Sequence, residues 1–297
     1  MKIEAAIAYT YTGHTNSIYT LCKYNHNQYI SAGSDGKVVA WNIDDACVAT
    51  VLVSVDAAIY TMAYDEKHQL LLVGLIDGRV IGFRLIDKIK IFETKLSQRS
   101  IFSILILNNS ILCGDESGCI SIIDFKGIII EQNKISEKSI RQIIKFNTEF
   151  IAASSDGRFY YLNQQLQIIK FVLAHNSSIF SIAYHKYSNH ILTGSRDAYL
   201  ALWDLDGLEL HRAPAHLFTI NAIQCHKTSP LIATASRDKT VKIWEIQDDT
   251  LLLLKVLDIS KFAAHTHSVN QVLWYDHHRL LSCSDDKKII QWKIHNI

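Results

Sequence analysis

The chain has 297 residues, and its 30 basic and 29 acidic side chains leave a formal net charge of +1. This balance gives no electrostatic basis for binding nucleic acid or an anionic membrane, so we expect neither as a partner. With 48% hydrophobic residues and only two prolines, the composition predicts a compact fold with little disorder.

The start of the chain does not resemble a secretory signal. Residues 1–4 (Met-Lys-Ile-Glu) are unlike the start of a secretory signal, and no apolar run approaches the roughly 18 residues needed to cross a bilayer. We therefore expect a soluble, cytoplasmic protein.

The elements that follow are expected to be short strands joined by tight turns. Tyr29 to Ala32 and Val38 to Ile43 are rich in β-branched and aromatic residues, and Gly33-Ser34-Asp35-Gly36 separates them. This arrangement recurs about every 40 residues along the chain, a period typical of repeat architectures.

The repeat can be counted from a turn residue that stands six positions before an apolar strand residue. The pairs are Asp35 and Trp41, Asp77 and Phe83, Ser117 and Ile123, Asp156 and Leu162, Asp197 and Trp203, Asp238 and Trp244, and Asp286 and Trp292. Seven units account for nearly the whole chain. The absence of a long polar linker predicts one domain over residues 1–297, although the length alone would suggest two.

These units resemble the WD40-repeat family. The resemblance rests on Gly13-His14, on Trp203-Asp204, and on Ser-x-Asp triplets that end at Asp197, Asp238 and Asp286. It extends over the full length and implies an all-β fold, a seven-bladed β-propeller of four-stranded antiparallel blades around a central channel.

The repeated polar residues are of types that can satisfy one another when buried. A loop histidine can bridge the turn carboxylate and a strand hydroxyl, which in turn meets the indole N–H. Three blades carry a complete predicted tetrad: His175, Ser195, Asp197 and Trp203; His216, Ser236, Asp238 and Trp244; and His265, Ser284, Asp286 and Trp292. Blade one keeps His14, Asp35 and Trp41 but has Gly33 at the hydroxyl position, and blades two to four depart further.

The two ends of the chain are expected to complete one blade. The last repeat stops soon after Trp292 and lacks an outer strand, while the N-terminal segment belongs to no blade of its own. We therefore predict that Lys2 to Tyr11 pairs with the blade that holds Trp292, which leaves no unpaired edge at the seam.

No catalytic or metal-binding residue is predicted. The six cysteines contain no C-x-x-C pair, so buried free thiols are expected rather than a metal site or a disulfide framework. Histidine, serine and aspartate are also the residue types of a hydrolase triad. Their recurrence beside tryptophan at three equivalent positions favours a structural network, and we expect no enzymatic activity and no cofactor.

Binding is the better supported class of function, because two sets of positions should lie on the face that carries the histidine loops, here called the His-loop face. The first set follows each buried strand-start residue and should surround the channel mouth: Tyr19, Tyr60, Phe102, Arg141, Phe180, Asn221 and Asn270. The second set precedes each turn residue: Ser34, Ile76, Glu116, Ser155, Arg196, Arg237 and Asp285.

The resemblance implies that these two sets are the usual partner contacts. We therefore expect a scaffold that binds a protein or peptide on this face, with aromatic and arginine side chains as its strongest contacts. Three alternatives stay open: the aromatics plug the propeller, the channel serves an enzyme or small-ligand sensor, or the chain is a fixed subunit that binds through its rim. A monomer and a subunit of a hetero-complex are both compatible with the sequence.

Overall fold

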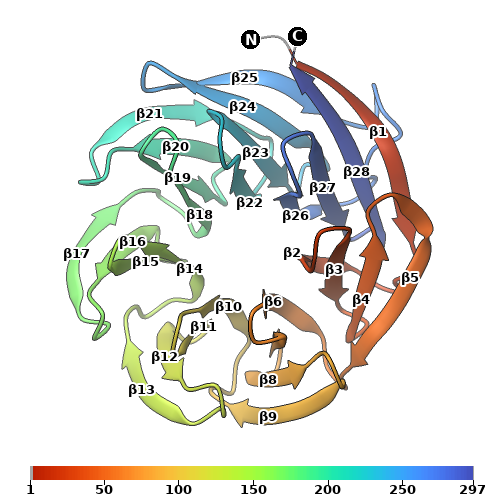
Figure 1. Cartoon of the computed structure of the whole chain (residues 1–297). Coiled ribbons are helices and arrows are strands. Elements are labelled where there is room, and N and C mark those ends of the chain that lie inside the picture. Colours follow the sequence, from red (N-terminus) through yellow and green to blue (C-terminus); the bar gives the residue numbers. More distant parts are fainter. Residues whose placement is uncertain (1–2, 297) are drawn as a thin grey trace. The chain divides into compact units, whose positions relative to one another are not determined.

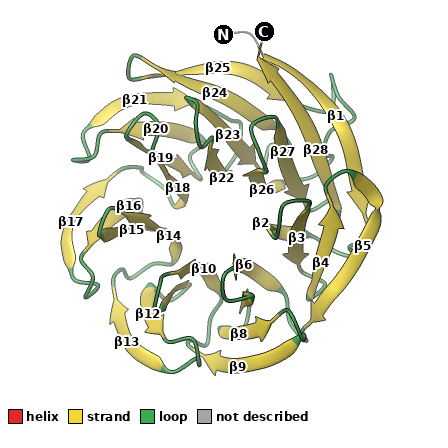
Figure 2. Ribbon diagram, in the orientation of Figure 1, coloured by secondary structure: helices red, strands yellow, loops and turns green. Residues whose placement is uncertain are grey.

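The computed structural model describes residues 3–296, in which every regular element is a β-strand (Figures 1 and 2). Lys2, the first residue of the predicted N-terminal strand, lies outside the described residues. Within the described residues, twenty-eight strands form seven four-stranded antiparallel sheets, which confirms the predicted all-β class and the seven blades of a β-propeller. No helix in the described part of the chain is long and apolar enough to cross a membrane.

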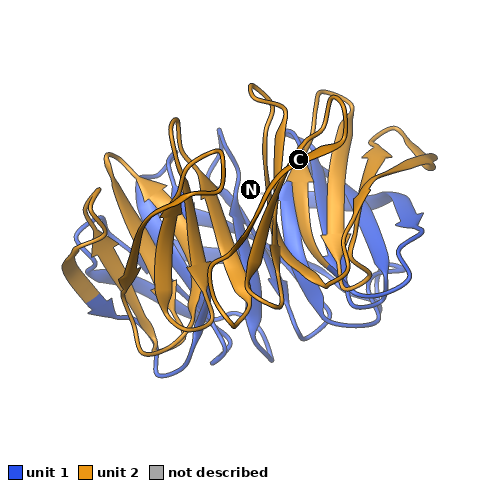
Figure 3. Ribbon diagram, turned by 90° about the horizontal axis from the view of Figure 1, so that it is seen from below, with its two compact units in different colours: residues 1–18, 172–297 blue, residues 19–171 orange. Residues whose placement is uncertain are grey.

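The chain divides into two compact units (Figure 3). One comprises residues 19–171, and the other comprises residues 1–18 together with 172–297. The divisions fall at the start of β2 (Ile18–Lys23) and inside β17 (Ile168–Leu173).

Four sheets belong to the unit of residues 19–171, and the strands of each follow one another in chain order. They are β2 with β3 (Gln28–Gly33), β4 (Lys37–Asn42) and β5 (Asp45–Ser54); β6 (Ile59–Asp65), β7 (Leu70–Leu75), β8 (Arg79–Arg84) and β9 (Ile89–Lys95); β10 (Ile101–Ile106), β11 (Ile111–Asp115), β12 (Cys119–Ile123) and β13 (Ile129–Lys134); and β14 (Ile140–Phe146), β15 (Glu149–Ser154), β16 (Arg158–Leu162) and β17.

Three sheets belong to the other unit, and one of them joins the two ends of the chain. They are β18 (Ile179–His185), β19 (His190–Ser195), β20 (Tyr199–Trp203) and β21 (Glu209–Pro214); β22 (Ile220–Cys225), β23 (Leu231–Ser236), β24 (Val241–Gln247) and β25 (Thr250–Leu257); and β26 (Val269–Trp274), β27 (Arg279–Ser284), β28 (Lys288–Asn296) and β1 (Ile3–Thr12).

The pairing of β1 with β28 confirms the prediction for the chain ends. The two strands run antiparallel, Ile7 lies opposite Trp292, and a register shift follows between Ile7 and Tyr9. The Tyr11 hydroxyl also donates a hydrogen bond to Gln291 Oε1 at 2.6 Å. The N-terminal segment therefore supplies the outer strand of the last blade.

Burial explains why inner strands read as continuous apolar runs. Every residue of β7 is buried, because neighbouring sheets cover both of its faces. The outer strand of the same sheet, β9, keeps one buried residue, Phe92, and mixes isoleucine with lysine and glutamate. The cores lie between adjacent sheets, so each inner strand contributes to the packing on both sides.

In each blade, the residue that follows the repeated turn position has a left-handed backbone conformation. Gly36 has a φ of 69°, and a Cβ there would lie 2.4 Å from the carbonyl oxygen of Val55. In the last three blades the same position is held by Ala198, Lys239 and Lys287, also at positive φ. These turns therefore carry backbone strain that the first four blades avoid with glycine.

Candidate functional site

The loop histidine of blade five connects the turn carboxylate to the indole through one strand hydroxyl. His175 Nδ1 lies 3.0 Å from Asp197 Oδ2, and its Nε2 lies 2.8 Å from Thr193 Oγ1. Trp203 Nε1 donates to that same hydroxyl at 2.8 Å. The network predicted from the sequence therefore exists, but its hydroxyl belongs to Thr193 and not to Ser195.

The same correction applies to the next two blades. His216 and Trp244 meet at Thr234 Oγ1, at 2.8 and 3.0 Å. His265 and Trp292 meet at Ser282 Oγ, at 2.8 and 2.9 Å. The predicted Ser236 and Ser284 accept hydrogen bonds from the backbone N–H groups of Asp238 and Asp286 instead.

Strand register is the physical reason for the difference. Trp203 lies opposite Ile191 in the ladder between β19 and β20, so its indole reaches the residue two positions further on. Ser195 lies two residues beyond Thr193, about 7 Å along the strand, where it caps the turn at the strand end. A hydroxyl ten residues before each tryptophan is the signal that identifies the correct partner.

Blade one retains this hydroxyl, contrary to the expectation that Gly33 removes it. Trp41 Nε1 donates to Ser31 Oγ at 2.7 Å, again across ten residues. Blade four has serine at the histidine position: Ser136 Oγ donates to Asp156 Oδ2 at 2.9 Å and accepts from Ser154 Oγ at 2.9 Å. The network therefore persists in reduced form where the sequence motif has changed.

The electrostatics of these networks suit a structural role. Burial opposes ionisation of Asp238, but the hydrogen bond from His216 and the charge interaction with that ring outweigh burial and hold the pKa of the carboxyl below its usual range. Both ring nitrogens of His216 are engaged, one with the carboxylate and one with Thr234. The hydroxyl of Thr234 is fully buried and also accepts a hydrogen bond from Trp244 Nε1, so it is covered rather than presented to solvent.

In the unit of residues 19–171, four side chains on the His-loop face form a continuous row. The ring centroids of Tyr19 and Tyr60 are 5.1 Å apart, and those of Tyr60 and Phe102 are 5.6 Å apart. The Arg141 guanidinium lies over the Phe102 ring with Cζ 4.3 Å from the centroid. We call these four residues the aromatic row; each is partly exposed.

Two polar residues next to the row hold its cationic end. Arg141 Nε donates to Ser155 Oγ at 2.9 Å. Burial lowers the pKa of the Arg141 guanidinium, while the carboxylate of Glu116 acts in the opposite direction. Glu116 is in turn fixed by a hydrogen bond from Ser100 Oγ at 3.0 Å. The cationic end of the row therefore has fixed geometry.

In the other unit, two of the predicted contact residues serve the fold. Asn221 Nδ2 donates to Ser268 Oγ and to the carbonyl oxygen of Val269, at 3.0 and 2.8 Å. Asn270 Nδ2 donates to the carbonyl oxygen of Ile18 and to Asp285 Oδ1, at 2.9 and 2.8 Å. Both amide groups are engaged in these hydrogen bonds, so less of their hydrogen-bonding capacity is available to a partner.

The other predicted residues of this unit are more accessible. Phe180 is partly exposed, and Arg196 and Arg237 are exposed. Within residues 3–296, neither guanidinium has an ion pair or a hydrogen bond, whereas the backbone N–H groups of both arginines donate to neighbouring loops at 2.9 and 3.0 Å. These two arginines are thus held at the backbone and offer unengaged charges to solvent.

Sequence reasoning missed two exposed residues beside Arg237. Leu217 and Phe218 follow the loop histidine of blade six, and their exposed fractions are 83% and 57%. The signal was available in the repeat, because the corresponding positions of the other six blades hold polar or small residues.

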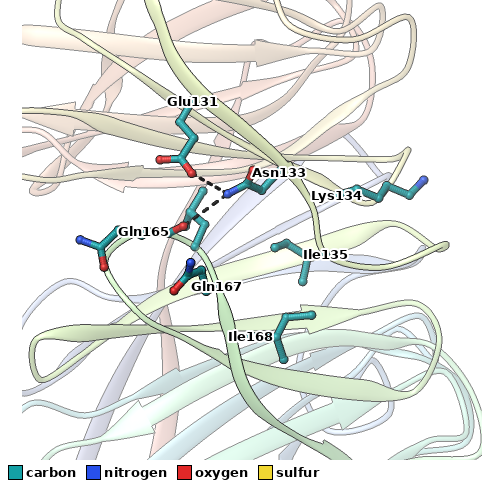
Figure 4. Close-up of a pocket in the computed structure, with 8 residues that line it drawn as sticks. Glu131, Asn133, Lys134, Ile135, Gln165, Gln167 and Ile168 are labelled. Carbon is teal, nitrogen blue, oxygen red and sulfur yellow. Dashed lines mark hydrogen bonds between the residues drawn. The ribbon is translucent and has the colours of Figure 1, made fainter.

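A groove of about 460 Å³ lies on the unit of residues 19–171, between β13 and the turn that leads into β17 (Figure 4). Asn133 Nδ2 crosses it, donating to Glu131 Oε1 at 2.6 Å and to the carbonyl oxygen of Gln165 at 3.3 Å. Ile135 and Ile168 supply apolar lining. The groove contains no arrangement of nucleophile and base, and no metal-binding group of three or more ligands occurs among residues 3–296.

The cysteines are free thiols throughout the chain. Cys113 and Cys283 are buried as expected, and Cys22, Cys119 and Cys225 are only partly buried. Cys47 is exposed on β5, so the expectation of burial is wrong for that residue.

Comparison with solved structures shows the same fold in other proteins. The WD40 β-propeller domain of Doa1 superposes with a TM-score of 0.84 at 20% identity, covering 98% of this chain and 97% of that one. A chain in a crystal structure of the mitotic checkpoint complex gives a TM-score of 0.87 at 16% identity, covering 99% and 94%. Identities this low establish the fold alone. A search of curated proteins found no match.

Comparison with models of protein families identifies the family from the repeats. The WD40 family, described as WD domain, G-beta repeat, matches residues 6–42, 166–204, 207–245 and 257–293, which together make up just over half of the chain. The chain belongs to the WD40-repeat family.

Proposed function

We propose that this chain is a non-catalytic scaffold that binds a segment of a partner protein on its His-loop face. The aromatic row is the observation that carries the proposal. Aromatic and arginine side chains dominate interface energetics, and here three rings and one guanidinium stand in contact while each stays partly exposed. If these four side chains served only to pack the fold, we would expect other residues to cover them and shield them from solvent.

The partner segment fits the row with an apolar side chain on the rings and a carboxylate toward Arg141. The guanidinium is already partly desolvated and positioned by Ser155, so a carboxylate meets a pre-organised cation. The proposed contact residues in the unit of residues 19–171 are Tyr19, Tyr60, Phe102, Glu116 and Arg141. In the other unit they are Phe180, Arg196, Asn221, Arg237, Asn270 and Asp285.

A cytoplasmic location and a single domain over the chain form part of this proposal. Six free thiols suit a reducing compartment. No repeat motif is interrupted by a long linker, which supports one domain.

The test is affinity capture from the source lysate, followed by titration of the purified partner. Tyr60→Ala and Arg141→Ala should each weaken binding about tenfold, because each removes a central contact of the row. Tyr187→Ala is the control, since Tyr187 is a tyrosine with an exposed fraction of 59% that lies in the loop between β18 and β19 and is not part of the aromatic row. Equal affinity for all three variants would place the site elsewhere.

The rim supports a second candidate function, that of a subunit fixed in a larger assembly. The outer strands β9, β13 and β17 expose Ile89, Ile129, Ile130, Ile169 and Phe171. Apolar side chains on strands with open edges are suited to pairing with an added strand. Phe171→Glu would weaken such an assembly and leave binding by the aromatic row intact. Titration of this variant with the purified partner therefore distinguishes the two functions: a loss of affinity favours the rim, and an unchanged affinity favours the aromatic row.

A further inference from the structure

The seven blades provide an internal comparison for the loop that enters each of them. The two residues after the loop histidine position are Thr15 and Asn16, Asp56 and Ala57, Gln98 and Arg99, Glu137 and Lys138, Asn176 and Ser177, Leu217 and Phe218, and Thr266 and His267. Blade six alone places two large apolar side chains there. Because the other blades fold with polar or small residues, the fold itself does not require this pair.

The backbone of Leu217 and Phe218, here called the apolar tip, is held by hydrogen bonds to side chains of the neighbouring turn. Leu217 N donates to Asp238 Oδ2 at 3.0 Å, and the carbonyl oxygen of Phe218 accepts from Ser236 Oγ at 3.2 Å. The next carbonyl, of Thr219, accepts from Arg237 N at 3.0 Å. The tip is therefore presented rigidly, which lowers the entropy cost of binding through it.

Cations border the tip on two sides. Arg237 and Lys239 are exposed in the turn to which the tip is bonded. On the other side, the N–H groups of Ala215 and His216 both donate to the carbonyl oxygen of Ala198 at 3.1 Å, which brings the turn that carries Arg196 next to the loop. No acidic side chain neutralises these three cations in the described residues, because the nearby Asp238 is committed to His216.

From this arrangement we infer that the apolar tip inserts into an apolar pocket on a folded partner protein, and that carboxylates at the pocket rim face Arg196, Arg237 and Lys239. The inference rests on the proposed function, since both arginines belong to the contacts proposed there, and it specifies the partner's chemistry. Two apolar anchors that become buried on binding, surrounded by a polar rim, form the usual pattern of an interface hot spot. A net charge of +1 gives no long-range attraction to an anionic membrane, which favours a protein as the occupant.

The test begins with a photo-crosslinking amino acid at position 217 of the full chain in its source cells, and with the same group at Thr266, the matching position of blade seven. A protein adduct at 217 that is absent at 266 is expected. That protein is then purified and titrated against the wild type, against the double variant Leu217→Asn with Phe218→Ser, and against Arg237→Glu. The double variant installs the side chains that blade five carries at these positions, and an unchanged melting temperature verifies its fold.

The affinity for the partner should fall about tenfold in the double variant. It should also fall in Arg237→Glu, and the difference in affinity between this variant and the wild type should become smaller as the salt concentration rises. No adduct at 217, or equal affinity of the wild type and the double variant, would overturn the inference. Loss of binding to phosphatidylserine vesicles in the double variant, or loss of a self-associated dimer, would overturn it in favour of a lipid surface or a second copy. If Tyr60→Ala lowers the affinity for the same partner while the double variant does not, the proposed function stands and this inference fails.

Discussion

Trp203 donates its indole N–H to the hydroxyl of Thr193 at 2.8 Å, and the imidazole of His175 meets the same oxygen at the same distance. One small side chain thus satisfies two buried polar groups from different elements. Its loss would remove this hydrogen bond from both groups, at about 1 to 3 kcal/mol for each.

Thr193→Val should therefore lower the free energy of unfolding by about 2 to 4 kcal/mol, although the two side chains have nearly the same shape. Ser195→Ala should cost about 1 kcal/mol, because it removes a turn cap. Chemical denaturation of both variants measures the difference. Equal losses would mean that the network contributes little beyond packing.

Trp203→Phe and Trp274→Phe offer a second comparison of the network with packing alone. Both tryptophans are buried, but Trp274 Nε1 has no hydrogen-bond partner in the described chain. We expect Trp203→Phe to cost about 2 to 3 kcal/mol, and Trp274→Phe about 1 kcal/mol or less, since the latter also removes an unsatisfied buried donor. A larger loss at Trp274 would contradict this account.

Deletion of residues 1–9 should lower the melting temperature by about 5 °C or more. The deletion removes most of β1, exposes the edge of β28, and uncovers Trp292 and Ile294. Tyr11→Phe is the mild control, because it keeps the strand and the aromatic ring and removes the hydrogen bond that the hydroxyl donates to Gln291. An unchanged melting curve after the deletion would show that β1 does not stabilise the last blade.

Stability should decrease as pH falls from about 6.5 toward 4, in part because of His185. Burial lowers the pKa of this side chain to about 4, and Ser188 N donates to its Nδ1, which holds the neutral ring with the Nε2 proton directed at the carbonyl oxygen of Ser229. The folded pKa lies below the unfolded one, so the stabilisation is complete above the unfolded pKa and is lost on acidification. His185→Gln should flatten the pH dependence of the melting temperature in this window, and an unaltered slope would exclude His185 as its source.

Lys239→Gly should raise the free energy of unfolding by about 0.5 to 1 kcal/mol, because the backbone there has a φ of 74°. Gly36→Ala is the reverse case, and its Cβ would collide with the carbonyl oxygen of Val55. It should therefore destabilise the chain. A loss of stability in Lys239→Gly would mean that its stem contacts outweigh the strain.

The periodicity of the sequence was sufficient for the strands and the blade count. Alternation of β-branched and aromatic residues with turn residues acts locally, so each repeat could be recognised without its neighbours. The outer strand supplied by Ile3–Thr12 was also predictable, since the last repeat stops one strand short.

The candidate site was predictable only in part. Tyr19, Tyr60 and Phe102 could be assigned to one face from strand alternation, but their contacts with one another and the position of Arg141 depend on how adjacent sheets pack. The amides of Asn221 and Asn270 were expected to be open to a partner, and packing directs them to neighbouring backbone instead.

By itself the sequence determined the repeat, the fold class, the family resemblance and the residue types of the buried networks, because these follow from local pattern. Only the tertiary structure decided that Thr193, Thr234 and Ser282 complete those networks, that the aromatic row is continuous, and that Leu217 and Phe218 stand rigid and exposed. Which hydroxyl meets an indole depends on strand register, and which side chains stay exposed depends on the packing of neighbouring sheets, both of which join residues far apart in the chain.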